Sequence, residues 1–270
     1  MNQMADLRIF SYLPNPRLFK ATIAARLVDV EVEIRGARPK ELPEWLWDFD
    51  ARPLTDADRA NESYARSARA GFSGTLYKTD EFITANPYGT VPVAFSPDGE
   101  VGIFESNSML RAVARLARSG PALYGDGPYQ ASRIDSFLDA SLVFARDSQR
   151  YLFGLMGQGL TDELHKGMTQ AFNAYLNGIE ATLTNNPDYL VGNDITCADI
   201  CFAAEIVLFA LSRTEKKRIE DAGFTLIYDE QTAVTFPRAM AHLDKLLGLP
   251  SFTPDLTPYH SEMTLAKFLS

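Results

Sequence analysis

The chain has 270 residues, of which 46% are hydrophobic and 23% are charged, as in a globular protein with a substantial core. Its formal net charge of −9 argues against a nucleic-acid-binding surface, because binding to phosphates needs clustered Lys and Arg. No apolar run approaches the roughly 20 residues that span a bilayer, and the first residues lack the basic and apolar regions of a secretory signal. We therefore expect a cytoplasmic protein with neither a nucleic-acid nor a membrane partner.

Cys197 and Cys201 lie four residues apart, on one face of a predicted helix. A redox pair or part of a metal site is one interpretation. Because no further cysteine or nearby histidine completes a set of ligands, small buried side chains are the favoured one. The histidines are spread singly, with no Ser, Cys or paired carboxylate at motif spacing. We predict no bound metal and no hydrolytic triad.

The first elements in the chain predict a β-α-β unit. Leu7–Tyr12 is a short β-prone run that ends at two closely spaced prolines. Apolar residues recur at helical spacing over residues 17–27, and residues 30–34 then alternate apolar with acidic, as a strand with one solvated face does. This order favours a parallel strand pair joined by a right-handed crossover.

Residues 36–77 interrupt the pattern, because they are polar, contain several prolines and include Trp45 and Trp47. Within this stretch, residues 55–70 are compatible with a helix whose charged side chains face solvent. We interpret residues 36–77 as an insertion that leaves the small domain.

After the insertion, regular elements return. Asp80–Ala85 is predicted to be a short helix, ended by an Asn-Pro step that disfavours helical backbone. Residues 91–95 and Gly102–Phe104 are predicted strands joined by a hairpin turn, and residues 106–117 form a helix capped at its start by serine.

Long amphipathic helices dominate the second half of the chain, beyond a Gly- and Pro-rich stretch at residues 118–128. These helices are expected at residues 130–154, 162–185, 196–211 and 236–247. Thr196 and Asp199 form an N-capping box, in which the Asp199 carboxylate reaches back to the amide of Thr196. The expected domains are residues 1–118, including the insertion, and residues 128–270, which are all helical.

Two short motifs can be interpreted as a peptide-binding site. A cis Val91–Pro92 bond would turn the backbone of Val91 outward, where its N–H and C=O can pair with an extended ligand. Ser106 at a helix start offers donors and the helix dipole to a carboxylate, while Glu105 pairs with an ammonium. An amino-acid head group needs both partners. For the Glu-Ser pair alone, a turn followed by a capped helix explains the residues; the preceding Val-Pro step favours binding.

These motifs resemble the signature stretches of glutathione S-transferases. The similar stretches are residues 86–92 (NPYGTVP), 104–107 (FESN) and 190–199 (LVGNDITCAD). The resemblance covers nearly the whole chain outside the insertion and the tail after Pro250. It implies a thioredoxin-like N-terminal domain, an all-helical C-terminal domain, a dimer, and glutathione as co-substrate.

The resemblance also assigns residues. Val91 corresponds to the backbone clamp for the cysteinyl part of glutathione and Pro92 to its cis-proline. Glu105 and Ser106 resemble the residues that bind the γ-glutamyl part. Lys78 is also expected to bind glutathione. Within the superfamily, residues 12–21 and 104–107 are most similar to the transferase-like domain of the elongation factor 1 gamma subunit.

The group that activates the thiol departs from the family pattern. An ordinary thiol has a pKa near 8.5, which a donated hydrogen bond and a helix N-terminus would lower. Asn15 stands where transferases carry Tyr, Ser or Cys. Its amide can donate to a thiolate, with Arg17 as a charge partner. The alternative is that Asn15 is a turn residue between two prolines.

Two functions stay open from the sequence. One is an enzyme that uses glutathione on a small hydrophobic or aromatic electrophile. Bacterial β-etherases, which cleave aryl ethers of lignin fragments, resemble the chain in their long insertion and non-Tyr thiol donor. The other is a non-catalytic interaction subunit similar to the elongation factor 1 gamma N-terminal domain, which the end of the chain at Ser270 disfavours. The dimer partner is a second copy or a related subunit.

Aromatic residues offer surface for the second substrate. They recur along the first long C-terminal helix and in the insertion: Phe137, Phe144, Tyr151, Phe153, Trp45 and Trp47. Such residues usually belong to the hydrophobic core. Alternatively, some of them line an apolar pocket for the second substrate.

Overall fold

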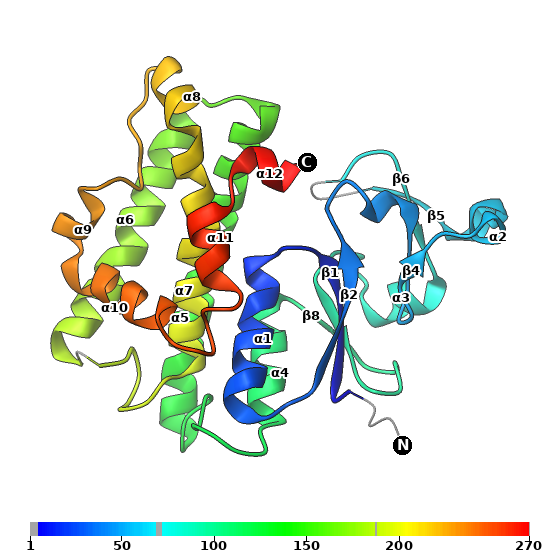
Figure 1. Cartoon of the computed structure of the whole chain (residues 1–270), viewed down its shortest axis with the longest axis horizontal. Coiled ribbons are helices and arrows are strands. Elements are labelled where there is room, and N and C mark those ends of the chain that lie inside the picture. Colours follow the sequence, from blue (N-terminus) through cyan, green and yellow to red (C-terminus); the bar gives the residue numbers. More distant parts are fainter. Residues whose placement is uncertain (1–4, 69–71, 187, 270) are drawn as a thin grey trace. The chain divides into compact units, whose positions relative to one another are not determined.

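A computed structural model describes residues 5–68, 72–186 and 188–269, apart from the side chain of Gln158. The outer limits of the predicted domains, residues 1 and 270, lie outside these ranges. The chain divides into two compact units (Figure 1). The first comprises Met1–Ser119 together with Phe268–Ser270, and the second comprises Gly120–Lys267.

The first unit is built on a sheet with the strand order β2-β1-β7-β8. β1 (Leu7–Tyr12) leads into α1 (Pro16–Val28), and β2 (Val32–Ala37) returns parallel to β1, which confirms the β-α-β opening. β7 (Val93–Phe95) runs antiparallel to β1, and β8 (Gly102–Phe104) pairs antiparallel with β7. A parallel pair extended by an antiparallel hairpin is the thioredoxin-like arrangement that the sequence resemblance implied.

β2 begins two residues later than the alternating pattern indicates. Asp29 adopts a left-handed backbone with φ of 55°, and the Val30 N–H donates to the Ala25 carbonyl at 3.1 Å. Residue 30 therefore still closes the end of α1. Alternation predicts which residues share a face, but the turn decides where strand pairing starts.

Helices cover one face of this sheet. α4 (Ser106–Arg115) packs against α1, and both lie on the same side of the strands (Figure 1). The other face carries Phe10 and is covered by the insertion and α3 (Asp80–Ala85). Because side chains alternate along a strand, Ile9 lies on the face opposite to Phe10. The two central strands, β1 and β7, thus carry most of the buried residues of the sheet.

The insertion forms a second sheet, in the order β4-β3-β6-β5. Its strands are β3 (Trp45–Trp47), β4 (Arg52–Pro53), β5 (Ala65–Ser67) and β6 (Thr75–Lys78). One buried cluster joins it to the first sheet: Phe10, Leu42, Trp47, Ala51, Leu76, Phe82, Val93 and Phe95. The expectation that residues 36–77 leave the small domain is therefore wrong, since they share its core.

The helix expected over residues 55–70 is wrong beyond its first turns. α2 (Asp56–Ala60) is followed by a 3-10 turn at Glu62–Tyr64 and then by β5. β5 pairs antiparallel with β6, a partner that the local charge pattern does not disclose. Arg69 and Ala70, the end of that expected helix, lie outside the described residues.

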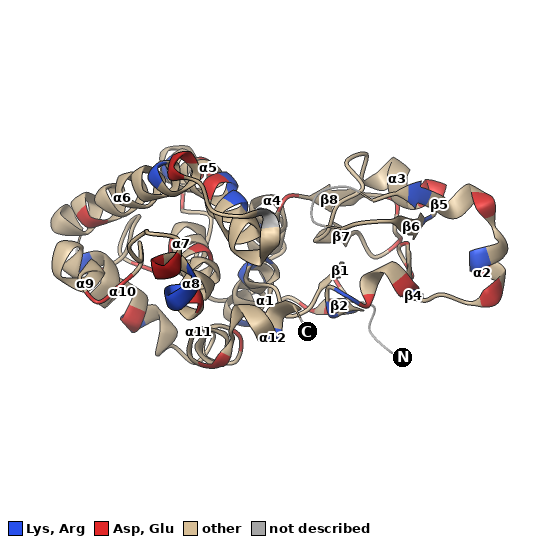
Figure 2. Cartoon of the chain, turned by 90° about the horizontal axis from the view of Figure 1, so that it is seen from above, with Lys and Arg blue, Asp and Glu red and all other residues tan. Residues whose placement is uncertain are grey.

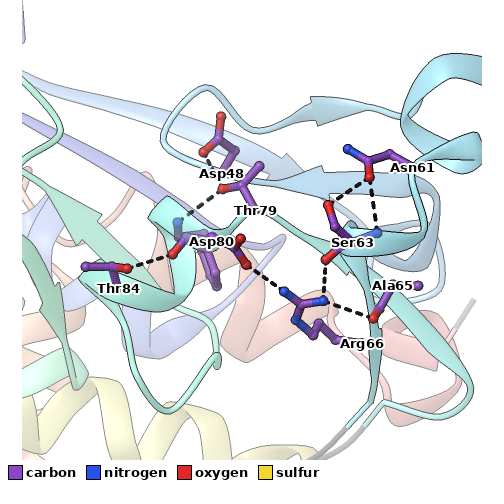
Figure 3. Close-up of polar contacts among 9 residues, drawn as sticks. Asp48, Asn61, Ser63, Ala65, Arg66, Thr79, Asp80 and Thr84 are labelled. Atoms are coloured by element: carbon purple, nitrogen blue, oxygen red, sulfur yellow. Dashed lines mark hydrogen bonds and ion pairs between the residues drawn. The ribbon is translucent and has the colours of Figure 1, made fainter.

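Polar contacts fasten the insertion to the start of α3 (Figure 3). Arg66 of β5 forms an ion pair with Asp80 at 2.7 Å and also donates to the Ala65 carbonyl at 3.3 Å. Thr79 donates to Asp48 at 2.8 Å and accepts the Phe82 amide at 3.1 Å as the cap of α3. The segment that precedes residues 86–92 is thereby anchored on both sides.

The second unit is helical, and its main helices confirm those predicted: α5 (Pro128–Phe153), α6 (Asp162–Asn185), α7 (Cys197–Phe209) and α10 (Pro237–Leu247). Shorter helices that the sequence analysis did not predict are α8 (Lys216–Asp221), α9 (Thr232–Thr235), α11 (Leu256–Glu262) and α12 (Leu265–Leu269), the last of which ends in residues assigned to the first unit. Within the described ranges, no helix combines the length and apolarity needed to cross a membrane.

Charged residues of both signs lie close together on exposed helices, as α5 and α8 show (Figure 2). In α8, Lys217 and Asp221 pair at 2.6 Å across one helical turn. Such exposed pairs typically contribute less than about 1 kcal/mol each. These pairs keep the surface solvated, and the fold is stabilised mainly by its apolar cores.

The capping box of α7 is present and has further partners. The Thr196 amide donates to one Asp199 carboxylate oxygen at 2.8 Å. The Leu190 amide donates to the other oxygen at 2.9 Å, and His242 Nε2 lies 2.8 Å from that same oxygen. Asp199 therefore ties the start of α7 to the preceding loop and to α10.

Several aromatic residues considered for an acceptor pocket lie in cores. Buried members of that set are Trp47, Phe144 and Tyr151. Phe144 stacks on Tyr175 with ring centres 4.6 Å apart. Because these rings are enclosed by their own unit, the pocket role is wrong for them. Trp45, Phe137 and Phe153 are half-buried.

Both cysteines are buried, which confirms the favoured interpretation of Cys197 and Cys201 as interior side chains. Cys201 Sγ donates to Ser141 Oγ at 3.1 Å. This contact joins α7 to α5.

The histidine of α6 makes stability depend on pH. His165 Nδ1 lies 3.1 Å from the Tyr151 hydroxyl, and its ring stacks on Phe224. Burial raises the pKa of Tyr151 to about 12, so the tyrosine stays protonated. Burial also lowers the pKa of His165 below its ordinary value of 6.5.

The unfolded chain therefore takes up the His165 proton more readily than the folded chain. Stability should be complete above about pH 6.5 and fall as the pH drops from there toward the lower folded pKa. We predict that His165→Phe flattens this fall, measured as the difference in urea midpoint between about pH 7.5 and about pH 5.5. An equal difference in wild type and variant would contradict the prediction. His260, whose pKa burial also lowers, remains in both proteins.

Candidate functional site

The strand register gathers the predicted site residues at one end of the first sheet. Phe10 pairs with Val93, and Val93 pairs with Phe104. If the β1–β7 and β7–β8 pairings are each continued by one residue, Pro92 lies between Ser11 and Glu105. The chain reverses near all three, because β1 ends there, β7 starts there and β8 ends there.

Asn15 is the N-cap of α1 and is fully buried. Its Oδ1 accepts the Arg17 amide at 3.0 Å, and its Nδ2 donates to Ser11 Oγ at 3.1 Å. The amide group thus joins the helix start to the end of β1. A primary amide has two N–H donors, so a second hydrogen exists beyond the bond to Ser11.

The backbone amides at the start of α1 are engaged. Leu18 and Phe19 both donate to the Asn15 carbonyl, at 2.9 and 3.1 Å, and Pro16 has no N–H. α1 therefore offers its dipole to an anion, while any hydrogen bond to that anion must come from a side chain. Arg17 is half-buried and lies in this first turn.

The Val91–Pro92 peptide bond is cis, as the sequence analysis expected. Both residues are half-buried and precede β7. Leu13–Pro14 is also cis, which the sequence analysis did not anticipate. Both bonds lie beside the end of β1.

Glu105 is the N-cap of α4 and has an unusual backbone, with φ of 69°. A left-handed conformation at a residue other than glycine costs of the order of 1–3 kcal/mol and clusters at functional sites. The Glu105 side chain is exposed, whereas Ser106 and Asn107 are buried. The backbone turn thus separates an outward carboxylate from an inward hydroxyl.

Lys20 is a residue of this site that the sequence analysis missed. It lies on α1, is fully buried, and donates from Nζ to Asn107 Oδ1 at 2.8 Å and to Ser106 Oγ at 3.3 Å. A charged residue within an otherwise apolar helix face was the available signal.

Lys78 points into the fold. Its side chain is 5% exposed, and Nζ donates to the Gly89 carbonyl at 2.5 Å and lies 4.4 Å from the centre of a Trp47 ring. Gly89 has φ of 60°, a conformation that glycine adopts readily. In this position Lys78 supports the loop that leads into Val91.

We predict that Lys78→Met lowers the free energy of unfolding by about 1–3 kcal/mol, because the buried Gly89 carbonyl loses its donor. Urea denaturation followed by tryptophan fluorescence reports on this unit, which contains Trp45 and Trp47. Lys40→Met is the control, since Lys40 is an exposed lysine of the same unit. A stability unchanged in Lys78→Met would instead favour a lysine that turns toward a ligand.

The groups at this end of the sheet suit a charged peptide. They comprise the backbone of Val91, the Glu105 carboxylate, the Ser106 hydroxyl and the Arg17 guanidinium. Among the described residues, no cluster of three or more His, Cys, Asp or Glu side chains is arranged to hold a metal ion. The chemistry available is binding, orientation and stabilisation of an anion.

Comparison with known proteins gives a family match for part of the chain and a likeness in fold. The family model "Glutathione S-transferase, C-terminal domain" matches residues 148–229. A structure titled "Ure2p in Complex with S-hexylglutathione" superposes with a TM-score of 0.64 at 15% identity, covering 94% of this chain and 100% of that one. The chain thus has the fold of glutathione S-transferases, and residues 148–229 match the C-terminal domain of that family.

Curated proteins of two kinds are among those similar to the chain. "Probable elongation factor 1-gamma 1" of Arabidopsis thaliana is 29% identical over 182 residues, which are 67% of this chain and 40% of that protein. "Glutathione S-transferase F10" of the same plant is 28% identical over 127 residues, 44% of this chain and 58% of the relative. The chain thus spans about two fifths of the elongation-factor relative.

Proposed function

We propose that the first unit binds glutathione and that the protein is a glutathione-dependent transferase. The observation that carries this proposal is the convergence of Asn15, cis Val91–Pro92 and Glu105–Ser106 at one end of the sheet. In this proposal residues 1–118 bind glutathione, and residues 128–270 form the helical domain.

Each group has a role in binding. The Val91 N–H and C=O pair with the cysteinyl backbone of glutathione as an added strand would. The exposed Glu105 carboxylate accepts the γ-glutamyl ammonium, and Ser106 donates to the neighbouring α-carboxylate. Lys78 acts through the Gly89 loop that carries Val91.

The chemistry is attack by a thiolate. The thiol loses its proton, the sulfur forms a bond to an electrophilic carbon, and the leaving group departs with the bonding electrons and takes up a proton. The second Asn15 N–H donates to the sulfur, and the Arg17 charge with the α1 dipole lowers the thiol pKa. The second substrate is a hydrophobic or aromatic electrophile; for a β-aryl ether, the leaving group is a phenolate.

The test is binding, then turnover. Isothermal titration of the full chain with glutathione should give a saturable heat, and a panel with an aryl halide and a β-aryl ether should show glutathione consumption. Glu105→Gln should weaken binding about tenfold or more, because a charge-assisted hydrogen bond is lost. Glu100→Gln, an exposed glutamate in the turn at the other end of the β7–β8 hairpin, should not. Absence of binding by the wild-type chain would overturn the proposal.

A second candidate is a non-catalytic interaction subunit, supported by the 29% identity to an elongation factor 1-gamma protein. In that case the chain forms a heterodimer with a related subunit, whereas the transferase forms a homodimer. Buried thiols at Cys197 and Cys201 suit the reducing cytoplasm in both cases. Mass photometry of the protein purified from its own cells, combined with the turnover panel, separates the candidates.

A further inference from the structure

Lys20 determines which way the donors of the candidate site point. Its ammonium lies within hydrogen-bond distance of Ser106 Oγ and Asn107 Oδ1, at the first residues of α4. An ammonium has three donors and no acceptor. Both oxygens must therefore accept from Lys20.

The two hydrogen bonds from Lys20 determine where the polar hydrogen atoms of Ser106 and Asn107 point. Ser106 has one hydroxyl hydrogen, and because its oxygen accepts from Lys20, that hydrogen is directed to another acceptor. Asn107 turns its oxygen toward the lysine, so its NH₂ group faces elsewhere. Lys20 thereby converts two side chains that could accept or donate into donors.

Charge acts in the same direction. The N-terminus of α4, a helix of 10 residues, carries the positive end of the helix dipole. A buried cation is screened less by salt than an exposed one. Together, these terms favour an anion beside Ser106 and disfavour a neutral group there.

We propose that Lys20 is a specificity-determining positioning residue that makes Ser106 select an α-amino-acid carboxylate. The inference rests on the proposed function and refines it: the ligand must carry a free α-carboxylate on its γ-glutamyl part. Lys20 acts through Ser106 and does not touch the ligand.

The experiment compares two ligands by isothermal titration calorimetry. One is glutathione, and the other is γ-aminobutyryl-cysteinyl-glycine, which lacks only the γ-glutamyl α-carboxylate. Lys20→Met should bind glutathione about tenfold to a hundredfold more weakly than wild type and bind the analogue with unchanged affinity. Lys40→Met, an exposed lysine in the same unit, should match wild type on both ligands.

The outcomes separate the two claims. Wild type that binds neither ligand overturns the proposed function and this inference with it. Wild type that binds glutathione, with Lys20→Met weakening both ligands equally or neither, overturns the role of Lys20 alone. If Lys20→Met does not fold, Lys20→Gln takes its place in the titrations, because glutamine keeps a hydrogen-bond donor for Asn107. If neither variant folds, Ser106→Ala tests the hydroxyl through which Lys20 is proposed to act, and equal losses on both ligands overturn the inference.

Discussion

Replacing Asp199 by alanine should lower the free energy of unfolding of the second unit by about 3–5 kcal/mol. The Asp199 carboxylate is fully buried and accepts the amides of Leu190 and Thr196, with His242 against it. Alanine leaves these donors buried without an acceptor, and it also removes the capping box of α7.

Chemical denaturation followed by the circular dichroism of the helices is the appropriate measurement, because both tryptophans lie in the first unit. Asp162→Ala is the matched control: Asp162 is an exposed acidic residue in the first turn of α6, and its loss should cost less than about 1 kcal/mol. A cost for Asp199→Ala similar to that of the control would contradict the prediction.

Replacing Asn15 by alanine should reduce turnover about a hundredfold, because a donor to the sulfur is lost. The thiol pKa should rise toward its ordinary value near 8.5, shifting the acid limb of the kcat/KM profile upward. Loss of the α1 cap should in addition cost about 1 kcal/mol of stability.

Asn15→Ser separates the two effects. Serine caps a helix and has a hydroxyl donor, so this variant should keep most of the stability and turnover that Asn15→Ala loses. Thr161→Ala removes the cap of α6, far along the chain, and should lower stability without moving the pH profile. An unchanged profile in Asn15→Ala would leave Arg17 as the activating group.

Local patterns predicted some site residues and missed others for a physical reason. Glu105, Ser106 and the Val91–Pro92 step belong to short motifs, so their residue types and spacing were enough to predict them as site residues. Lys20 binds a residue 86 positions away, and Lys78 turned inward because Gly89 and Trp47 meet it there. Partners so distant in sequence leave no periodic signal.

By itself, the sequence determined the β-α-β opening, the long helices α5, α6, α7 and α10, and the capping box at Thr196 and Asp199. These features arise from residues within a few turns of one another, whose periodicity and caps encode local structure. Only the tertiary structure decided that residues 36–77 form a sheet sharing a core with Phe10, and that residues 65–67 pair with β6 in place of forming a helix. Strand pairing and burial depend on a partner elsewhere in the chain, and that partner overrides local propensity.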